Sequence, residues 1–516
     1  MTETAAARDI LAGHAARTPD RPALIEGERR LSWRDYIERR NRVANALRDL
    51  DVGSGERVIV YAVNSLENIV ASAATRAAGA IPVPMNHRLT DEEVLYILDD
   101  ADAAAVFVSE AFLPLVERVR GKASTVRHWI LIGDARRPWA RAFDELAACG
   151  SVTAPATAGA QGAGASMVYT AGTTGKPKGA LRRAVDPNAL VIRLRDLDLA
   201  DGSHVHLVAG PLYHSAPGGF ALYAHLFGSP VVVMPRFDPE AALATIERHR
   251  CTSTFMAPTL LKRIVDLPEA VRRRYDVSSM RVLVVAAAPC PMRVKEEAIR
   301  YFGPVLYEFY GSTELGINTV LRPDDVLRKP HSCGRAATDV ELAILDEGGG
   351  RLPPGQPGEL FVRRSPSMFD EYWKKPEATR QTERDGWLSV GDVAWMDEEG
   401  FVYICDRKRD MIISGGVNIY PAEIEDALHR HPAVQDVAVF GVPDDEWGER
   451  VHAAVQVRAG HELDAAAVVA FARERLAGYK IPREVSFHAE LPRDAAGKLV
   501  KRHLRDRFWE GRAAKV

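Results

Sequence analysis

Short runs of apolar residues recur through the first 300 positions of the chain, and within each run they are continuous rather than alternating with polar residues. The runs lie at Val58–Val63, Ala103–Val108, Trp129–Ile132, Ser166–Thr170, Val231–Met234 and Arg281–Ala288. Continuous runs rich in Val and Ile are typical of strands that are covered on both faces of a sheet. Helical patterns separate them, and this alternation predicts an α/β fold with doubly wound, mainly parallel sheets.

One helical pattern has a clear start. Thr90 and Glu93 are spaced as a capping box, in which each side chain accepts a hydrogen bond from the backbone N–H of the other. Val94, Ile97 and Leu98 follow at positions that share one helical face. We therefore predict a helix that begins after Thr90 and buries these three residues.

The pattern changes from about Cys333 onward. Clusters of Gly and Pro alternate with short strand-like segments such as Glu359–Val362 and Phe401–Ile404. Short strands between turn residues predict a small barrel or antiparallel subdomain. Beyond position 409, strands mix with helices again, and one helix has Pro421 in its first turn.

Two domains are predicted from these changes. The N-terminal domain covers residues 1–408 and includes a β-barrel-like subdomain at about residues 333–408. Residues 409–516 form a smaller α+β domain, which is long enough to fold alone.

Composition excludes several classes of protein. With 67 basic and 70 acidic residues the formal net charge is −3, so no basic excess indicates a nucleic-acid partner. The five cysteines are scattered without a CxxC pair, which favours reduced thiols in a cytosolic protein over a zinc site or a disulfide framework. The sequence has no signal-peptide pattern and no apolar stretch of about 18 residues. We expect a cytoplasmic protein without a transmembrane segment. The sequence does not specify the oligomeric state, and both a monomer and a homo-oligomer stay open.

A loop rich in Gly, Thr and Lys directly follows one of the apolar runs. Its glycines let backbone N–H groups approach an anion, while its hydroxyl and ammonium groups donate to phosphate oxygens. The residues concerned are Thr170, Gly172, Thr173, Thr174, Gly175, Lys176 and Lys178. The loop is not a Walker A motif, because Pro177 stands where that motif has Ser or Thr. Taken alone, it predicts anion binding, with a polar surface turn as the alternative.

Four further motifs follow in order, at residues 307–314, 386–392, 406–425 and 491–502. Together with the glycine-rich loop they resemble the superfamily of AMP-forming acyl-adenylating enzymes. That superfamily includes acyl-CoA synthetases, the adenylation domains of nonribosomal peptide synthetases, and firefly luciferase. The resemblance covers nearly the whole chain and implies that the C-terminal domain is mobile.

The resemblance implies roles for five residues that face the nucleotide. Tyr310 would stack on adenine, and the Thr313 hydroxyl would bond the α-phosphate. Glu314 would hold Mg²⁺ against phosphate oxygens. Asp392 would accept hydrogen bonds from both ribose hydroxyls, and Arg407 would contact the nucleotide. Within the motif of Asp392, the family commonly has Thr where this chain has Val390, so one polar contact is missing there.

Other implied roles belong to the C-terminal domain. Lys498 is identified as the lysine that enters the active site for adenylation. Gly415 and Gly416 would let a pantetheine arm pass beside their backbone, and Lys480 would contact CoA, with a plain surface charge as the alternative. The hinge falls at Arg409, where the family usually has Asp or Lys.

The acid itself is not specified by the sequence. By resemblance His214 stands at the gate of the acyl pocket, with a packed core histidine as the alternative. The implied pocket residues are Phe309, Gly316, Ile317 and Asn318. They are mostly small or apolar, and no Arg or Lys evidently awaits a second carboxylate. We therefore expect a fatty or other hydrophobic acid, with an aryl acid as the alternative.

The function implied by the resemblance is an AMP-forming acyl-CoA ligase that uses ATP, Mg²⁺ and CoA. One alternative is a stand-alone adenylation enzyme that loads a carrier protein in trans. A luciferase-like oxygenase shares the motifs, and a non-catalytic nucleotide-binding module is a further alternative. The retained residues Thr313, Glu314, Asp392, Arg407 and Lys498 argue against this last class.

Overall fold

The computed structural model describes residues 9–155, 165–170, 176–184, 186–408, 410–415, 417–444, 446–493 and 499–510. Several predicted site residues lie outside these ranges: Gly172, Thr173, Thr174, Gly175, Gly416 and Lys498, together with the predicted hinge residue Arg409.

The largest sheet has nine strands in the order β16-β15-β14-β13-β12-β10-β11-β1-β2. They are β1 (Pro22–Glu26), β2 (Arg29–Ser32), β10 (His206–Val208), β11 (Val231–Val233), β12 (Ser253–Met256), β13 (Val282–Val285), β14 (Leu306–Ser312), β15 (Gly316–Leu321) and β16 (Arg335–Ala336). The six strands from β14 to β1 are parallel, and β2, β15 and β16 are antiparallel to their neighbours.

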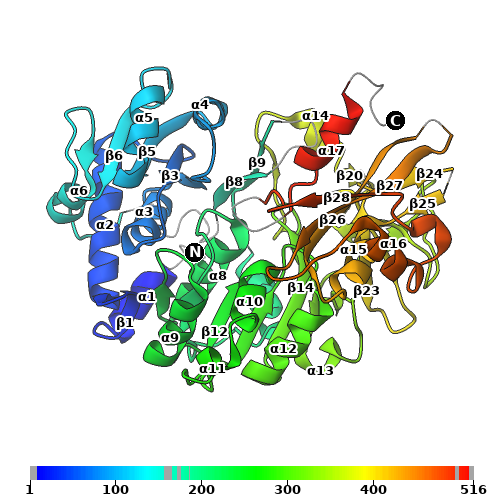
Figure 1. Cartoon of the computed structure of the whole chain (residues 1–516). Helices are drawn as coiled ribbons and strands as arrows, with labels where there is room; N and C mark the ends of the chain where they lie inside the picture. Colours follow the sequence, from blue (N-terminus) through cyan, green and yellow to red (C-terminus); the bar gives the residue numbers. More distant parts are fainter. Residues whose placement is uncertain are drawn as a thin grey trace.

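Helices cover both faces of this sheet (Figure 1). They include α7 (Pro187–Asp196), α8 (Ser215–Leu226), α9 (Pro239–His249), α10 (Pro258–Val265) and α12 (Met292–Phe302). Along β13, Leu283 and Val285 pack into the apolar cluster of α9, α10 and α12, whereas Val282 and Val284 pack into that of α7 and α8. The continuous apolar run predicted a strand covered on both faces, and the packing confirms it.

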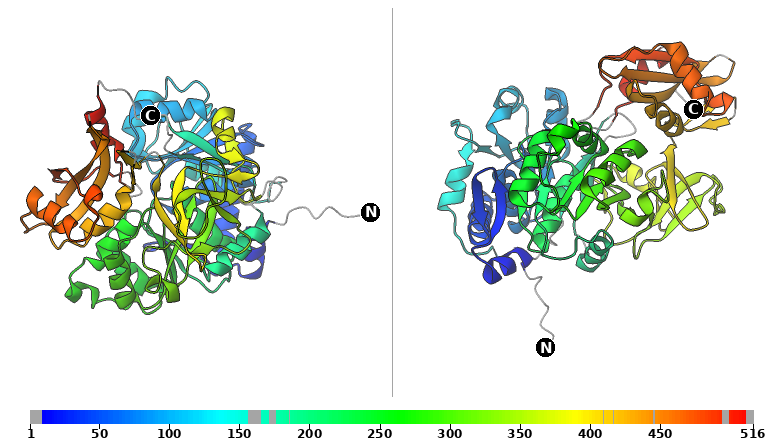
Figure 2. Two further views of the ribbon diagram at one scale, coloured as in Figure 1. Left: turned by 90° about the vertical axis from the view of Figure 1, so that its right-hand side faces the viewer. Right: turned by 60° about the horizontal axis from the view of Figure 1, so that its bottom comes forward.

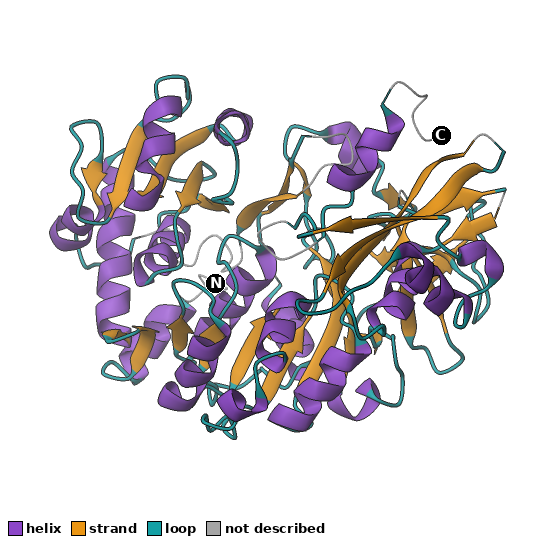
Figure 3. Cartoon of the chain, viewed as in Figure 1, coloured by secondary structure: helices purple, strands orange, loops and turns teal. Residues whose placement is uncertain are grey.

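A second sheet, all parallel, has the order β4-β3-β5-β6-β7. Its strands are β3 (Arg57–Tyr61), β4 (Ile81–Pro84), β5 (Ala103–Ser109), β6 (His128–Ile132) and β7 (Arg141–Ala142), and its helices are α2 (Trp33–Asp49), α3 (Leu66–Ala77), α4 (Asp91–Asp100), α5 (Leu113–Val119) and α6 (Phe143–Cys149). Helix α4 begins with the predicted capping box of Thr90 and Glu93, and Val94, Ile97 and Leu98 are its buried residues. Helices flank the strands of both large sheets in Figure 3, and the predicted α/β fold class is confirmed.

Two antiparallel sheets lie next along the chain. The first joins β8 (Ser166–Thr170), β9 (Lys178–Arg182) and β19 (Glu371–Tyr372). Here the prediction of a strand buried on both faces was wrong for β8, because only Met167 is fully buried within it. The second sheet contains β17 (Leu342–Leu345), β18 (Gly358–Arg363), β20 (Glu383–Arg384), β21 (Trp387–Leu388), β22 (Asp392–Met396) and β23 (Val402–Arg407).

The C-terminal part has a sheet and an apolar core of its own. Its elements are β24 (Ile412–Ser414), β25 (Val417–Ile419), α15 (Pro421–His429), β26 (Val434–Asp444), β27 (Gly448–Val457), α16 (Ala465–Arg473), β28 (Glu484–His488) and α17 (Arg502–Trp509). Pro421 occupies the first turn of α15. Figure 2 shows this unit, in orange and red, protruding from one side of the molecule.

The remaining elements are short or peripheral: α1 (Ile10–Arg17), α11 (Glu269–Arg272), α13 (Pro323–Val326), α14 (Pro376–Arg380) and two 3₁₀ turns at Glu110–Phe112 and Gly478–Lys480. Throughout the described ranges, every helix is too short or too polar to cross a membrane.

Candidate active site

The hairpin between β14 and β15 carries three of the predicted site residues. Ser312 pairs with Gly316, so Thr313 and Glu314 lie at the tip of the hairpin, while Tyr310 stays in the strand. The turn requires glycine at position 311, because a Cβ there would lie 2.1 Å from the carbonyl oxygen of Gly316. The close backbone approach therefore fixes where the tip points.

Glu314 joins this tip to the start of the predicted phosphate loop. Its carboxylate is nearly buried, with 7% of the residue exposed. Oε1 accepts hydrogen bonds from the Thr170 hydroxyl at 3.1 Å and from the Tyr372 hydroxyl at 2.8 Å. The Lys178 ammonium lies 5.1 Å from the centre of the Tyr372 ring. Burial and the Glu314 carboxylate raise the pKa of Tyr372, which keeps this hydroxyl a donor.

Asp100, at the end of α4, holds both ends of the same loop. Its side chain is 8% exposed, and its Oδ2 accepts a hydrogen bond from the Tyr169 hydroxyl at 2.7 Å. The Tyr96 hydroxyl lies 3.3 Å from Asp100 Oδ1 and 3.1 Å from the carbonyl oxygen of Pro177. The Lys176 ammonium lies 5.1 Å from the centre of the Tyr96 ring. Asp100 thus anchors Tyr169 directly on one side of the loop and lies beside Tyr96, whose hydroxyl reaches Pro177 on the other side. The sequence analysis missed this role.

We expect Asp100→Ala to raise the KM for ATP by about tenfold. Loss of the hydrogen bond from Tyr169 to the Asp100 carboxylate would weaken ATP binding by roughly 1.4 kcal/mol. The measurement is the ATP dependence of pyrophosphate release. Asp99→Ala is the matched control, since no hydrogen bond joins the Asp99 side chain to a described residue of the loop. An unchanged KM for ATP in Asp100→Ala would remove Asp100 from the positioning of the loop.

A second carboxylate, Asp392, lies where β22 pairs with β23. It stands opposite Arg407 in the strand register and is 7% exposed. Its Oδ2 accepts a hydrogen bond from the Tyr310 hydroxyl at 2.6 Å, and Arg407 Nε lies 3.4 Å from Oδ1. Burial and this carboxylate raise the pKa of Tyr310 far above its usual range. A carboxylate has about four acceptor positions, so Asp392 could accept further hydrogen bonds from the two hydroxyls of a diol.

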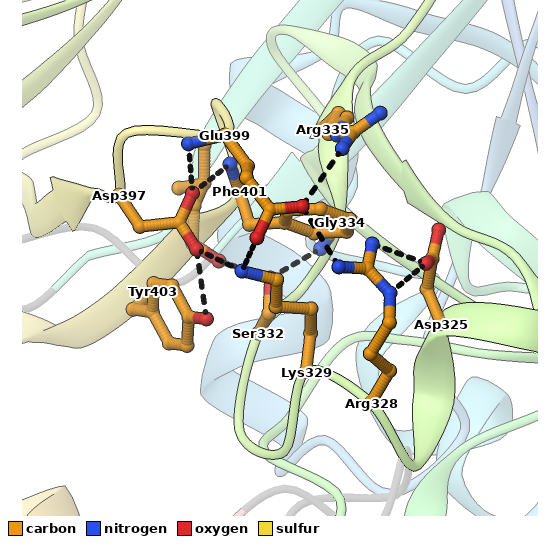
Figure 4. Close-up of polar contacts among 11 residues, drawn as sticks. Asp325, Arg328, Lys329, Ser332, Gly334, Arg335, Asp397, Glu399, Phe401 and Tyr403 are labelled. Carbon is orange, nitrogen blue, oxygen red and sulfur yellow. Dashed lines mark hydrogen bonds and ion pairs between the residues drawn. The ribbon is translucent and has the colours of Figure 1, made fainter.

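An ion network ties the β22–β23 turn to the large sheet (Figure 4). The Lys329 ammonium lies 2.8 Å from Asp397 Oδ2 and 2.5 Å from Glu399 Oε1. Phe401 is fully buried, and three cations lie 4.2–5.0 Å from the centre of its ring: Arg328, Lys329 and Arg335. This anchorage holds the hairpin that carries Asp392 and Arg407.

His214 precedes the first residue of α8 and lies beside the hairpin tip. Its ring centre is 4.4 Å from that of Tyr213, and the next residue, Ser215, has its hydroxyl 3.1 Å from that of Thr313. Helix α8 contributes Phe220 to an apolar cluster that also contains Phe309 and Ile317, two of the residues implied to line the acyl pocket.

Gly415 and Lys480 lie in the C-terminal unit, and no contact between described residues joins them to the groups around Glu314 and Asp392. Gly415 has φ +57°, and a Cβ there would lie 2.5 Å from the ring of Trp447, so glycine is required. The Lys480 ammonium lies 2.6 Å from both carboxylate oxygens of Glu423, an ion pair that the sequence analysis did not anticipate.

Comparisons with known proteins can be set beside this geometry. The sequence profile described as AMP-binding enzyme matches residues 11–373, and the profile of the AMP-binding enzyme C-terminal domain matches residues 423–498. The chain belongs to the AMP-binding enzyme family.

Relatives within this family include a long-chain-fatty-acid–CoA ligase of Bacillus subtilis, 33% identical over 96% of this chain and 93% of its own length. A fatty acid–[acyl-carrier-protein] ligase, ScoC of Streptomyces coeruleorubidus, is 31% identical over 98% and 96%. Among solved structures, that of the anthranilate CoA ligase AuaEII in complex with anthranoyl-AMP matches with a TM-score of 0.88. It is 28% identical in sequence, and the match covers 97% of this chain and 96% of that one. The family predicted from the five ordered motifs is thereby confirmed.

Proposed function

We propose that this AMP-binding enzyme is an ATP-dependent acid–thiol ligase that converts a carboxylic acid into an acyl-adenylate and then into its CoA thioester. The observation that carries the proposal is the contact between the Thr170 hydroxyl and the Glu314 carboxylate. It brings the start of the predicted phosphate loop to the hairpin tip that carries Thr313, although these segments are far apart in sequence.

In the first half-reaction an oxygen of the acid attacks the α-phosphorus of ATP. The bond from that phosphorus to the pyrophosphate oxygen breaks, so acyl-AMP and pyrophosphate form. No side-chain nucleophile is required, and the residues act by positioning and by charge. The loop from Thr170 to Lys178 holds the departing phosphates, Thr313 donates to the α-phosphate, and Asp392 accepts from the ribose hydroxyls.

The residues around Glu314 fit Mg²⁺, which usually binds one or two carboxylates together with water and substrate phosphates. No group of three or more His, Cys, Asp or Glu side chains suited to a metal gathers within the described ranges, so the described residues supply no complete cage. Both hydrogen bonds that described residues donate to the Glu314 carboxylate end on Oε1, so Oε2 could act as a ligand to the ion. When bound, the ion would neutralise charge on the phosphates.

In the second half-reaction the CoA sulfur attacks the acyl carbonyl carbon, and the bond from that carbon to the AMP oxygen breaks. We propose that residues 409–516 form a domain that turns about Arg409 between the two steps. Lys498 would serve the first step, and Gly415 and Gly416 the second. Lys480 would reach CoA after leaving Glu423.

An apolar acid body would lie against the apolar cluster that contains Phe309 and Ile317. Its aromatic rings lie close together, with Phe220 and Phe255 stacked at 5.3 Å and Phe255 and Phe309 6.2 Å apart. A fatty or other hydrophobic acid is the proposed substrate class, and these flat rings make an aryl acid the second candidate. A carrier protein in place of CoA is the alternative acceptor, supported by the name of the Streptomyces relative.

The proposal is tested by supplying ATP, Mg²⁺ and a panel of fatty and aryl acids, and by measuring exchange of labelled pyrophosphate into ATP. CoA and a carrier protein are then compared as acceptors. We expect exchange with at least one acid and a thioester with CoA. Absence of exchange with every acid would instead support a non-catalytic nucleotide-binding protein.

We expect Glu314→Gln to lower kcat/KM for ATP on the order of 10²-fold and to raise the Mg²⁺ concentration required, since one charged ligand is lost. The amide still accepts the hydrogen bonds of Thr170 and Tyr372, so the fold is kept. Glu377→Gln, on the exposed helix α14, is the control. An unchanged magnesium dependence would remove Glu314 from the metal site.

A further inference from the structure

Two arginine side chains lie beside the β14–β15 hairpin, and no carboxylate of the described ranges pairs with either of them. Arg193, on α7, is buried with 5% of the residue exposed, and Arg182 ends β9. Within the described residues, no carboxylate oxygen lies within 4.0 Å of either guanidinium. The Nε atoms of both arginines are buried and make no hydrogen bond. A buried guanidinium without a counter-charge is strongly unfavourable unless something else binds it.

Both guanidinium groups border the same hairpin. Arg182 Nη2 donates to the carbonyl oxygen of Thr313 at 3.2 Å, and Arg193 Nη2 donates to the hydroxyl of Ser365 at 3.2 Å. A Cβ built on Gly316 would lie 3.5 Å from Arg193 Nη1. Burial lowers the pKa of Arg193, and the positive charge of Arg182 acts in the same direction. The two cations therefore sit together at the tip that carries Thr313.

The surrounding acids and polar groups leave these charges unsatisfied. Asp186 and Asp339 are near enough to act on Arg193 electrostatically, but both lie beyond ion-pair distance. Two further buried atoms beside Gly316 make no hydrogen bond, Asn318 Oδ1 and Ser367 Oγ. Folded proteins leave few buried polar atoms unpaired, so four such atoms on residues that border one hairpin indicate a place that a ligand completes.

This place adjoins the apolar cluster proposed for the acid. Leu190 and Leu194 lie on the same helix as Arg193, and they pack in that cluster with Phe309 and Ile317. The α7 helix therefore carries Arg193 next to residues of this cluster, and Gly316, whose side contacts Arg193, directly precedes Ile317 of the cluster. An arginine fork matches the two oxygens of a carboxylate.

We propose that Arg193 and Arg182 form a subsite for a second carboxylate of the acid, distinct from the carboxylate that becomes the adenylate. The inference rests on the proposed function and narrows its substrate class to acids with an apolar body and a second anionic group. The second carboxylate is held and not activated, so it undergoes no bond change.

The test compares α,ω-dicarboxylic acids, aliphatic and aromatic, with their monomethyl esters in the pyrophosphate-exchange assay on the full chain. We expect kcat/KM for the best diacid to exceed that for its monoester by about 10- to 100-fold, the effect of one charge-assisted hydrogen-bond pair. Arg193→Met should bring this ratio close to one by lowering the value for the diacid alone. Arg182→Met should shift the ratio in the same direction. Arg195→Met, on the exposed side of the same helix, should leave it unchanged.

Thermal stability without substrate provides a second readout. Since no described carboxylate pairs with Arg193, Arg193→Met should melt at the same temperature as the wild type or higher, whereas a purely structural arginine would make the variant melt lower. Equal losses for diacid and monoester in Arg193→Met would overturn the subsite, because Arg193 would then serve the reacting carboxylate. Turnover of monocarboxylates without preference for any diacid would also overturn it while leaving the proposed function intact. Absence of exchange with every acid would refute the proposed function itself.

Discussion

Replacement of Lys498 by Ala is expected to slow acyl-adenylate formation on the order of 10²- to 10³-fold, the effect of removing one preorganised group that stabilises charge in a transition state. The lysine ammonium would neutralise the charge that builds between the attacking carboxylate and the α-phosphate. The reaction of preformed acyl-AMP with CoA should keep its wild-type rate, because the phosphorus is not attacked in that step and the proposed second step uses a different placement of the C-terminal domain. Pyrophosphate exchange measures the first half-reaction, and thioester formation from added acyl-AMP measures the second.

The comparison between the half-reactions makes the result decisive. Lys501 is a suitable control because it lies three residues away and is held by the Glu425 carboxylate at 2.9 Å. Lys501→Ala should lower the stability of the C-terminal unit and affect both half-reactions alike. If Lys498→Ala also slowed both half-reactions equally, the proposal that the two steps use different placements of the C-terminal domain would be wrong.

Local sequence signals predicted much of the fold. The capping box of Thr90 and Glu93 depends only on residues three positions apart, and the structure has both of its hydrogen bonds. The run at Arg281–Ala288 contains β13 because unbroken apolar residues suit both faces of a parallel sheet. The run at Ser166–Thr170 gave a strand as well, but its environment was mispredicted, since Tyr169 and Thr170 turn polar atoms toward Asp100 and Glu314.

Contacts between distant segments were beyond the reach of these signals. Asp100 lies 69 residues before Tyr169, and nothing in its neighbourhood indicates that it anchors a loop. The same holds for Tyr372 and Glu314, which are 58 residues apart. The residues implied to line the acyl pocket included no Arg or Lys that evidently awaits a second carboxylate. Arg193 lies in a helix beside the exposed Arg195, and a local pattern does not show which of these two arginines is buried.

Replacement of Lys295 by Met is expected to lower the free energy of unfolding by about 3–5 kcal/mol, the usual effect of removing one partner from a buried ion pair. Lys295 lies on α12 with 1% of its side chain exposed, and its ammonium pairs with the carboxylate of Glu308 on β14. Met fills a similar volume, so the loss comes from the charge left on Glu308 and not from a cavity. Urea denaturation measures the effect. The control is Lys262→Met, because Lys262 on α10 forms a more exposed ion pair with Asp266.

The double variant Lys295→Met, Glu308→Leu separates two explanations of that loss. If the uncompensated carboxylate causes the instability, removing it as well should restore most of the stability, because a buried ion pair is often no better than apolar residues of similar size. If the double variant stays as unstable as the single one, the pair itself contributes the stability and the argument from an unpaired charge fails. Since Glu308 lies two residues before Tyr310 in β14, the same series also reports whether the charge pair positions the proposed adenine site. A restored double variant with a raised KM for ATP would assign the pair to positioning, and one with an unchanged KM would confine it to folding.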